Sequence, residues 1–208
     1  MPTKKRVSPE RTYLYIDGTN LFAGLVELFG PDKIPQFVTI LKDIEALVKP
    51  QKVYFYASYM VGANYNRRPE LRKLAGTEGH FYSEVKKTKN LTFYKGSRSP
   101  TSGKEKGVDV HLAVDIVRDV FLKKCKNVII MTGDADLVYP LEIAKQFGAK
   151  VQAIFLPNRF SLGITVESDK ATILNYLGKF AFRSGGRIPR KLEVLAIKRP
   201  RVHAPGVG

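Results

Sequence analysis

The chain has 208 residues, of which 44% are hydrophobic, enough for one domain of ordinary size or at most two small ones. Lys and Arg outnumber Asp and Glu by 35 to 19, and the resulting formal net charge of +16 favours a polyanionic partner. A single cysteine excludes an internal disulfide and a cysteine-rich zinc site, and the lack of a signal-like or membrane-spanning apolar run predicts a cytoplasmic protein with no membrane partner.

The chain begins with a basic tail, residues 1–11, which holds four basic residues and one acid. Short apolar runs rich in Val, Ile, Tyr and Phe then alternate with longer helical patterns. Strands are predicted at 12–16, 52–58, 127–132 and 150–155, with a weaker pair at FYSEV (81–85) and LTFYK (91–95), and helices at 36–48, 67–76, 107–124 and 136–147. This order predicts an α/β fold, a doubly wound, mostly parallel sheet with helices on both faces.

Two segments lack such a pattern. Residues 96–107 form a Ser, Gly and Lys-rich loop, and residues 179–208 form a second basic extension with eight basic residues and one acid. We therefore place the folded domain at 12–178. A charge excess gathered at the ends suits a phosphate backbone, whereas solvated tails without a partner are the alternative interpretation. The run LEVLAI in the extension is predicted to be a strand only if another strand pairs with it.

Acidic residues follow two of the predicted strands. Asp17 comes directly after the first strand, and Asp134 and Asp136 come after NVIIMT. Parallel strands deliver their carboxyl ends to one rim, where ligands bind at the point at which strand order reverses. If these two strands are central neighbours, the acids meet there. Taken singly, each acid has a structural explanation as a helix cap, a first-turn acid or a turn residue.

The helix predicted at 107–124 begins at the same rim and contributes Asp109. Positions 109, 113, 116 and 120 form one stripe, which is predicted to face the sheet, so that Asp109 points inward. Asp115 belongs to the neighbouring stripe, about 9 Å further along the axis, and is predicted to be a supporting group. Several carboxylates so close together repel one another unless a cation lies between them. Oxygen ligands, with Asn20 as a neutral member, favour Mg²⁺ or Mn²⁺ over zinc.

Other chemistries find little support. His80, His111 and His203 form no catalytic grouping, and the chain lacks GxxxxGK[ST] and a strand-linked GxGxxG. The stretch YIDGT resembles the DxDGT motif of HAD-type phosphatases, but the position of the nucleophile is occupied by Tyr15. A phosphoacceptor domain of the receiver type lacks its early paired acids.

At its acidic motifs the sequence resembles the NYN domain, the PIN-like group that includes LabA-type proteins. The matching pieces are YIDGTNL (15–21), VYFYASY (53–59), KGVDVHLAVDIV (106–117) and TGDADLVYPLEIAKQFGAKV (132–151), and the resemblance spans roughly residues 12–176. It implies a PIN-like, Rossmann-like three-layer fold and a metal-dependent ribonuclease. Residues 87–105 and the part after 178 match nothing in the family's pattern.

The resemblance also implies roles for individual residues. Asp17, Asp109, Asp134 and Asp136 are the expected catalytic, metal-binding acids, with Asn20 as a further ligand, and Lys106 and Asp115 are supporting. With RNA as the substrate that the resemblance implies, a set of basic and aromatic side chains is expected to contact it in single-stranded form: Lys86, Lys87, Lys89, Lys95, Arg98, Tyr59 and Tyr94. A homodimer is compatible with this class of domain. The alternative function is an RNA-binding or regulatory protein with the same fold and little or no turnover.

Overall fold

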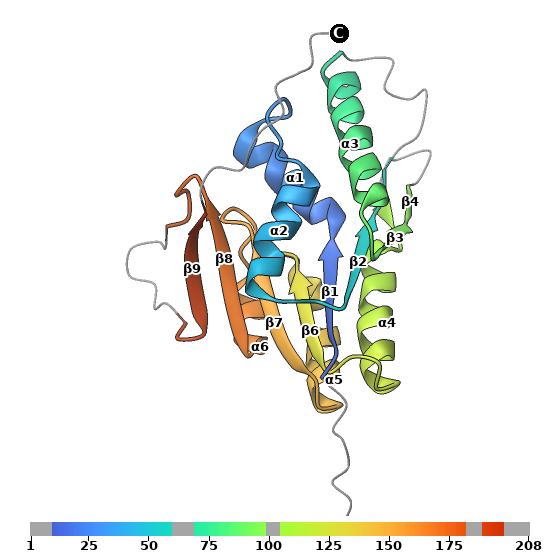
Figure 1. Ribbon diagram of the computed structural model, residues 1–208, viewed down its shortest axis with the longest axis vertical. Coiled ribbons are helices and arrows are strands. Elements are labelled where there is room, and N and C mark those ends of the chain that lie inside the picture. Colours follow the sequence, from blue (N-terminus) through green and yellow to red (C-terminus); the bar gives the residue numbers. More distant parts are fainter. Residues whose placement is uncertain (1–9, 60–68, 99–104, 182–188, 198–208) are drawn as a thin grey trace, which may run out of the picture.

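A computed structural model describes residues 10–59, 69–98, 105–181 and 189–197. A parallel sheet runs through the middle of the molecule with helices on both of its sides (Figure 1). The predicted fold class, a doubly wound parallel sheet in three layers, is confirmed. His203 and most of the basic N-terminal tail lie outside the described residues.

The described residues form a seven-stranded sheet in the order β3-β2-β1-β6-β7-β8-β9, and every neighbouring pair is parallel. The strands are β1 (Thr12–Asp17), β2 (Lys52–Ala57), β3 (Leu91–Lys95), β6 (Asn127–Met131), β7 (Lys150–Phe155), β8 (Lys170–Tyr176) and β9 (Leu192–Ile197). The short strands β4 (Ser97–Arg98) and β5 (Glu105–Lys106) form a separate antiparallel pair. Strand order reverses between β1 and β6, which confirms that these two strands are central neighbours.

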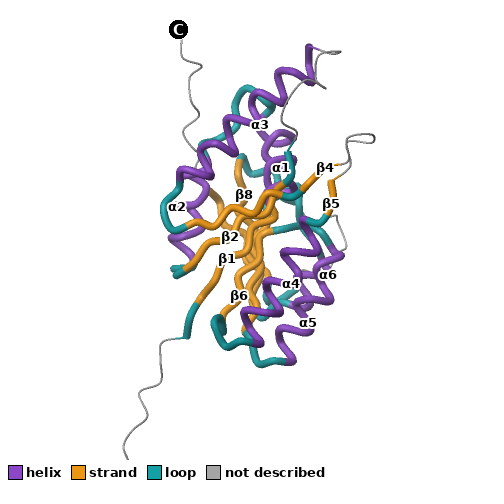
Figure 2. The backbone as a smooth tube through the Cα atoms, turned by 90° about the vertical axis from the view of Figure 1, so that its right-hand side faces the viewer, coloured by secondary structure: helices purple, strands orange, loops and turns teal. Residues whose placement is uncertain are grey.

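The helices divide between the two faces of the sheet (Figure 2). One face is covered by α1 (Gly18–Phe29), α2 (Phe37–Leu47) and α3 (Pro69–Lys87), and the other by α4 (Val108–Phe121), α5 (Val138–Gln146) and α6 (Leu162–Glu167). Because side chains of a strand alternate, Leu14 and Ile16 of β1 enter the first layer, whereas Tyr13 and Tyr15 enter the second. Both layers are therefore hydrophobic cores.

The structure corrects two predicted elements before residue 90. The helix α1 was not predicted, although it begins directly after the first strand. The strand predicted at FYSEV is wrong, because these residues belong to α3. Phe81, Tyr82 and Val85 are all buried, which fits the spacing of a helix, since a strand would turn Tyr82 to the opposite side.

The carboxyl-terminal part of the sheet was also incompletely predicted. Neither α6 nor β8 was assigned, although β8 is buried on both faces. The run LEVLAI does find a partner, because β9 pairs with β8 in parallel. The sheet therefore continues past residue 178. Among the described residues, no helix combines the length and the apolar character that crossing a membrane requires.

Candidate functional site

Asp17 is the last residue of β1 and lies where strand order reverses. It caps the N-terminus of α1, because its Oδ1 accepts a hydrogen bond of 2.9 Å from the backbone N–H of Asn20. Its Oδ2 accepts a 2.8 Å hydrogen bond from the hydroxyl of Thr132. With 4% of its surface exposed, this carboxyl group is held in one orientation at the rim.

The segment after β6 is tied to Asp17 and Asn20. The Thr132 hydroxyl oxygen accepts a hydrogen bond from the backbone N–H of Asp134, and the Asn20 Oδ1 accepts one from the N–H of Gly133, both 3.0 Å long. Only glycine fits at position 133, since a Cβ there would lie 2.4 Å from the carbonyl oxygen of Arg159. The ends of β1 and β6 therefore form one rigid unit.

Asp134 begins the short 3-10 helix η2 (Ala135–Leu137), which leads into α5. Its Oδ1 accepts a 3.0 Å hydrogen bond from the backbone N–H of Asp136, so the cap predicted as a structural explanation is present. Asp134 is half-buried and Asp136 is exposed. The remaining carboxylate oxygen of Asp134 and the whole carboxylate of Asp136 thus lie at the accessible side of the rim.

Asp109 lies in the first turn of α4, which begins after Gly107 in the left-handed conformation with φ +81°. The predicted stripe 109, 113, 116 and 120 is only partly correct. Val108, Leu112 and Ile116 face the sheet, and Asp109 is exposed because the helix is rotated relative to the prediction. Its carboxylate nevertheless interacts electrostatically with Asp17, Asp134 and Asp136, which lie on the other two segments.

The acids of the rim alter one another's ionisation. Burial raises the pKa of Asp17 to about 7, against the lowering effect of its two hydrogen bonds, and the charges of Asp109 and Glu105 raise it further. Although Asp109 is exposed as a residue, its carboxyl group is partly desolvated, which is the first cause that raises its pKa, and the charges of Asp134, Glu105 and Asp136 raise it further. Among the described residues, however, no three Asp, Glu, His or Cys side chains lie close enough to form a ready-made metal site.

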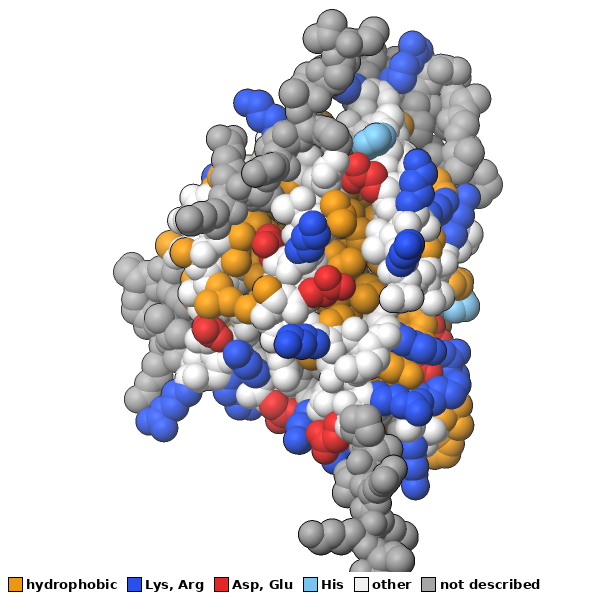
Figure 3. All heavy atoms as spheres, viewed as in Figure 1, with side chains coloured by type: hydrophobic (Ala, Val, Ile, Leu, Met, Phe, Trp, Pro, Cys, Tyr) orange, Lys and Arg blue, Asp and Glu red, His pale blue; other side chains and the backbone are white. Residues whose placement is uncertain are grey.

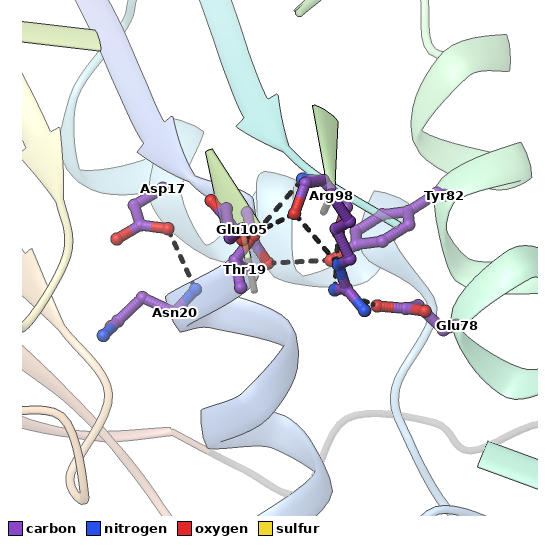
Figure 4. A network of polar contacts seen from close by, with 9 residues as sticks. Asp17, Thr19, Asn20, Glu78, Tyr82, Arg98 and Glu105 are labelled. Atoms are coloured by element: carbon purple, nitrogen blue, oxygen red, sulfur yellow. Dashed lines mark hydrogen bonds and ion pairs between the residues drawn. The ribbon is translucent and has the colours of Figure 1, made fainter. Parts of the chain in front are cut away.

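Glu105 is an acid of this rim that the sequence interpretation missed. It lies on β5, and its Oε2 accepts a 2.7 Å hydrogen bond from the hydroxyl of Ser58 at the end of β2 (Figure 4). The signal in the sequence was its position four residues before Asp109. That signal was lost because the segment was assigned to a loop.

Arg98 holds the β4–β5 pair in place. Its guanidinium donates to the hydroxyl and carbonyl oxygens of Ser58 at 3.0 and 2.7 Å, and forms a 3.0 Å ion pair with Glu78 of α3 (Figure 4). Its side chain is 19% exposed. The guanidinium predicted to contact RNA is therefore engaged by internal partners.

Asp115 lies away from the rim group and acts within the α4 layer. Its carboxylate accepts a 2.8 Å hydrogen bond from the Tyr56 hydroxyl and forms a 2.7 Å ion pair with Arg118. The nearby Asp119, also missed by the sequence interpretation, is buried and accepts from the hydroxyl of Tyr15. These acids fix tyrosines beneath the rim.

Basic and aromatic side chains meet near the carboxyl ends of β2 and β3. The Nζ atoms of Lys86 and Lys95 lie 4.7 and 4.6 Å from the ring centroid of Tyr59, and the ring of Tyr94 stacks on that of His111 with centroids 4.1 Å apart. Lys87, Lys89, Lys95 and Lys106 are exposed. Figure 3 shows basic side chains along the edge of the molecule formed by α3 and α4.

Comparison with known proteins gives a family and a fold. The model of the NYN domain matches residues 11–172. A solved structure, a protein of unknown function VPA0982 from Vibrio parahaemolyticus RIMD 2210633, is similar with a TM-score of 0.54 and 15% sequence identity. The similarity covers 80% of this chain and 93% of that one, and at this identity it concerns the fold alone. In the comparison with curated proteins, none matched.

Proposed function

The chain belongs to the NYN domain family, which has a nuclease-like fold, and from this premise we propose that it is a metal-dependent ribonuclease. The observation that carries the proposal is geometric: the Thr132 hydroxyl donates to Asp17 and accepts from the backbone N–H of Asp134, which brings acids of two segments to one rim. Burial, and to a smaller extent the charges of Asp109 and Glu105, raise the pKa of Asp17 there. Carboxylates that meet at the point of strand reversal favour a cation between them, and the chain's formal net charge of +16 suits a polyanionic substrate.

The side chains of the rim fit Mg²⁺ or Mn²⁺ by their chemistry, because they offer only carboxylate and amide oxygens. Mg²⁺ usually keeps several waters and binds one or two carboxylates together with substrate phosphates, so it does not require three converged acids. The residues proposed to hold it are Asp17, Asn20, Asp109, Asp134 and Asp136. When bound, such an ion supplies a water of lowered pKa and offsets negative charge on the phosphate.

The chain's own groups orient the substrate. Thr132 and Asn20 fix the direction of the Asp17 carboxylate, and the exposed Lys106 lies two residues before the helix that carries Asp109. Lys86, Lys87, Lys89 and Lys95 are proposed to bind RNA phosphates, and Tyr59 and Tyr94 to stack on bases of a single strand. Phosphate contacts of this kind give salt-sensitive binding with little base specificity.

A second candidate function is RNA binding without turnover. The observation that favours it is the absence of a three-acid cluster among the described residues. In that case the acids and the basic edge serve recognition or regulation, and added Mg²⁺ changes RNA binding but produces no cleavage.

The substitution Asp134→Asn distinguishes the two functions. Asparagine caps helices as well as aspartate does, so the hydrogen bond to the N–H of Asp136 can be kept and the fold preserved. We expect cleavage of single-stranded RNA with Mg²⁺ or Mn²⁺ to fall on the order of a hundredfold or more, with RNA binding retained.

The matched control is Asp32→Asn, which removes an exposed acid paired with Lys73 away from the rim and is expected to leave cleavage unchanged. Absence of metal-dependent cleavage by the parent protein, with RNA bound, would instead establish the binding function.

A further inference from the structure

The helix α4 carries two apolar faces where a helix that covers a sheet needs one. Val108, Leu112 and Ile116 are fully buried against the sheet. On the opposite side, Val110, Val114 and Phe121 are 65%, 56% and 62% exposed. Val117, which is half-buried, continues the same row, because spacings of four, three and four residues keep side chains on one side of a helix.

This row extends onto the neighbouring helix. The ring of Phe121 contacts that of Phe147, directly after α5, edge to face with centroids 5.5 Å apart. Phe147 is itself 51% exposed. We call Val110, Val114, Val117, Phe121 and Phe147 the α4 outer patch. In Figure 2, α4 lies beside α5 in the helical layer on one side of the sheet. A contiguous exposed apolar surface with aromatic anchors is typical of protein interfaces.

The charges around α4 identify the surface that complements this patch. At the N-terminal end, Asp109 interacts with Glu105, Asp134 and Asp136. At the C-terminal end, the exposed Lys123, Lys124 and Lys126 follow the helix. A second copy of α4 running antiparallel sets the acidic end of each helix against the basic end of the other, and it also opposes the helix dipoles. A parallel arrangement sets like charges together.

We propose that the α4 outer patch is a homodimer interface in which two copies of α4 pack antiparallel about a twofold axis. Such an interface is isologous, so each residue meets its counterpart in the reverse order. With the axis between residues 115 and 116, Val110 of one subunit faces the partner's Phe121, and Val114 faces the partner's Val117. The patch is thereby removed from water on both copies.

This dimer has a consequence for the rim that rests on the proposed function. In the same register the partner's Lys123 and the partner's Lys124 lie opposite the start of α4, next to the acids. Each subunit then contributes basic groups beside the other's acidic rim, where RNA phosphates are proposed to bind. The dimer is measured without RNA or metal. A monomeric chain therefore contradicts the dimer proposal alone, and a dimer that does not cleave RNA contradicts the nuclease proposal alone.

The first experiment measures mass in solution by sedimentation velocity of the full chain. We expect the parent to be a dimer and Val114→Glu to be a monomer with an unchanged circular dichroism spectrum, since Val114 is exposed within one subunit. The matched control is Val166→Glu on α6, which replaces a valine that is 63% exposed, and it is expected to remain a dimer. A monomeric parent, or a dimer that survives Val114→Glu, overturns the proposal.

The second experiment tests orientation by cross-linking single cysteine variants with a short bis-maleimide. At 1.5 Å per residue, antiparallel packing offsets the two cysteines of a Val114→Cys dimer by about 4.5 Å along the axis, but those of a Val110→Cys dimer by about 16.5 Å. We expect Val114→Cys to cross-link with itself. Val110→Cys and Phe121→Cys are expected to cross-link only when mixed with each other.

Native Cys125 is buried, and the parent chain, which carries no introduced cysteine, measures any cross-linking through Cys125. Equal self-cross-linking of all three variants indicates parallel helices and overturns the antiparallel arrangement. Failure of Val114→Cys to cross-link in a dimeric sample places the interface elsewhere and overturns the proposal as well.

Discussion

At the scale of single residues, the buried position of Asp17 opposes the ionisation of its carboxyl group. Its carboxyl group is buried, and its pKa is raised from 3.8 to about 7. Below pH 4 the group is protonated in both the folded and the unfolded chain. Between pH 4 and 7 the folded chain keeps a proton that the unfolded chain releases, so the stability contributed by Asp17 falls as pH rises and is lowest above pH 7.

The variant Asp17→Asn removes this titration. Between pH 5 and pH 8 without divalent cations, we expect the free energy of unfolding of the parent to fall relative to this variant, on the order of 2 kcal/mol. Urea unfolding at the two pH values gives the difference. Mg²⁺ at pH 8 is expected to stabilise the parent but not the variant, because a ligand that binds only the folded state raises its stability.

The control for this prediction is Asp32→Asn, which removes an exposed carboxylate away from the rim. Its stability relative to the parent is expected to be the same at both pH values. A constant difference between the parent and Asp17→Asn would show that Asp17 ionises normally.

At the scale of elements, the β4–β5 pair depends on one ion pair. Arg98 pairs with Glu78, whose side chain is 9% exposed and whose pKa is raised chiefly by burial, with Arg98 opposing that effect. We expect Arg98→Ala to lower the free energy of unfolding by about 3 kcal/mol, because it leaves a buried carboxylate without its partner. Adding Glu78→Gln should recover part of this loss, giving a coupling energy of about 1 to 3 kcal/mol in a double-mutant cycle.

The exposed pair Lys73–Asp32 provides the comparison for this cycle. Its side chains are 60% and 57% exposed, and its coupling energy is expected to be at most about 0.5 kcal/mol. Equal coupling energies for the two pairs would show that burial of the Glu78–Arg98 pair does not hold the β4–β5 segment.

At the scale of the whole molecule, β9 closes one edge of the sheet. Its register pairs Ile173, which is fully buried, with Val194. Truncation after Pro189 removes β9 and leaves the edge of β8 without its partner, where it can pair with other chains. We expect this truncation to lower the melting temperature by several degrees and to promote aggregation, as measured by scanning calorimetry and light scattering.

Truncation after Lys198 is the control, because it retains β9 and removes only the residues that follow it. We expect its melting temperature to match that of the full chain. The pair of truncations also tests the domain boundary predicted at residue 178. Equal melting temperatures for the two truncated chains would place β9 outside the cooperative unit.

The sequence by itself determined the order and class of the elements. Val, Ile and Tyr-rich runs alternate with helical patterns, and this local information was enough to predict a doubly wound parallel sheet and to place Asp17 and Asp134 directly after strands. That these two strands are neighbours was a condition that only the structure showed to be met. Four linked motifs also identified the NYN family. These predictions succeeded because strand and helix signals depend on side chains close together in the chain.

Only the tertiary structure decided the features that depend on distant residues. The face of α4 that meets the sheet, the contact of Glu105 with Ser58, and the pairing of LEVLAI with β8 each require a partner that lies elsewhere in the chain. The same holds for FYSEV, whose short apolar pattern was assigned to a strand until the packing of α3 resolved it. The physical reason is that burial and hydrogen bonding select among conformations that a short sequence leaves nearly equal in free energy.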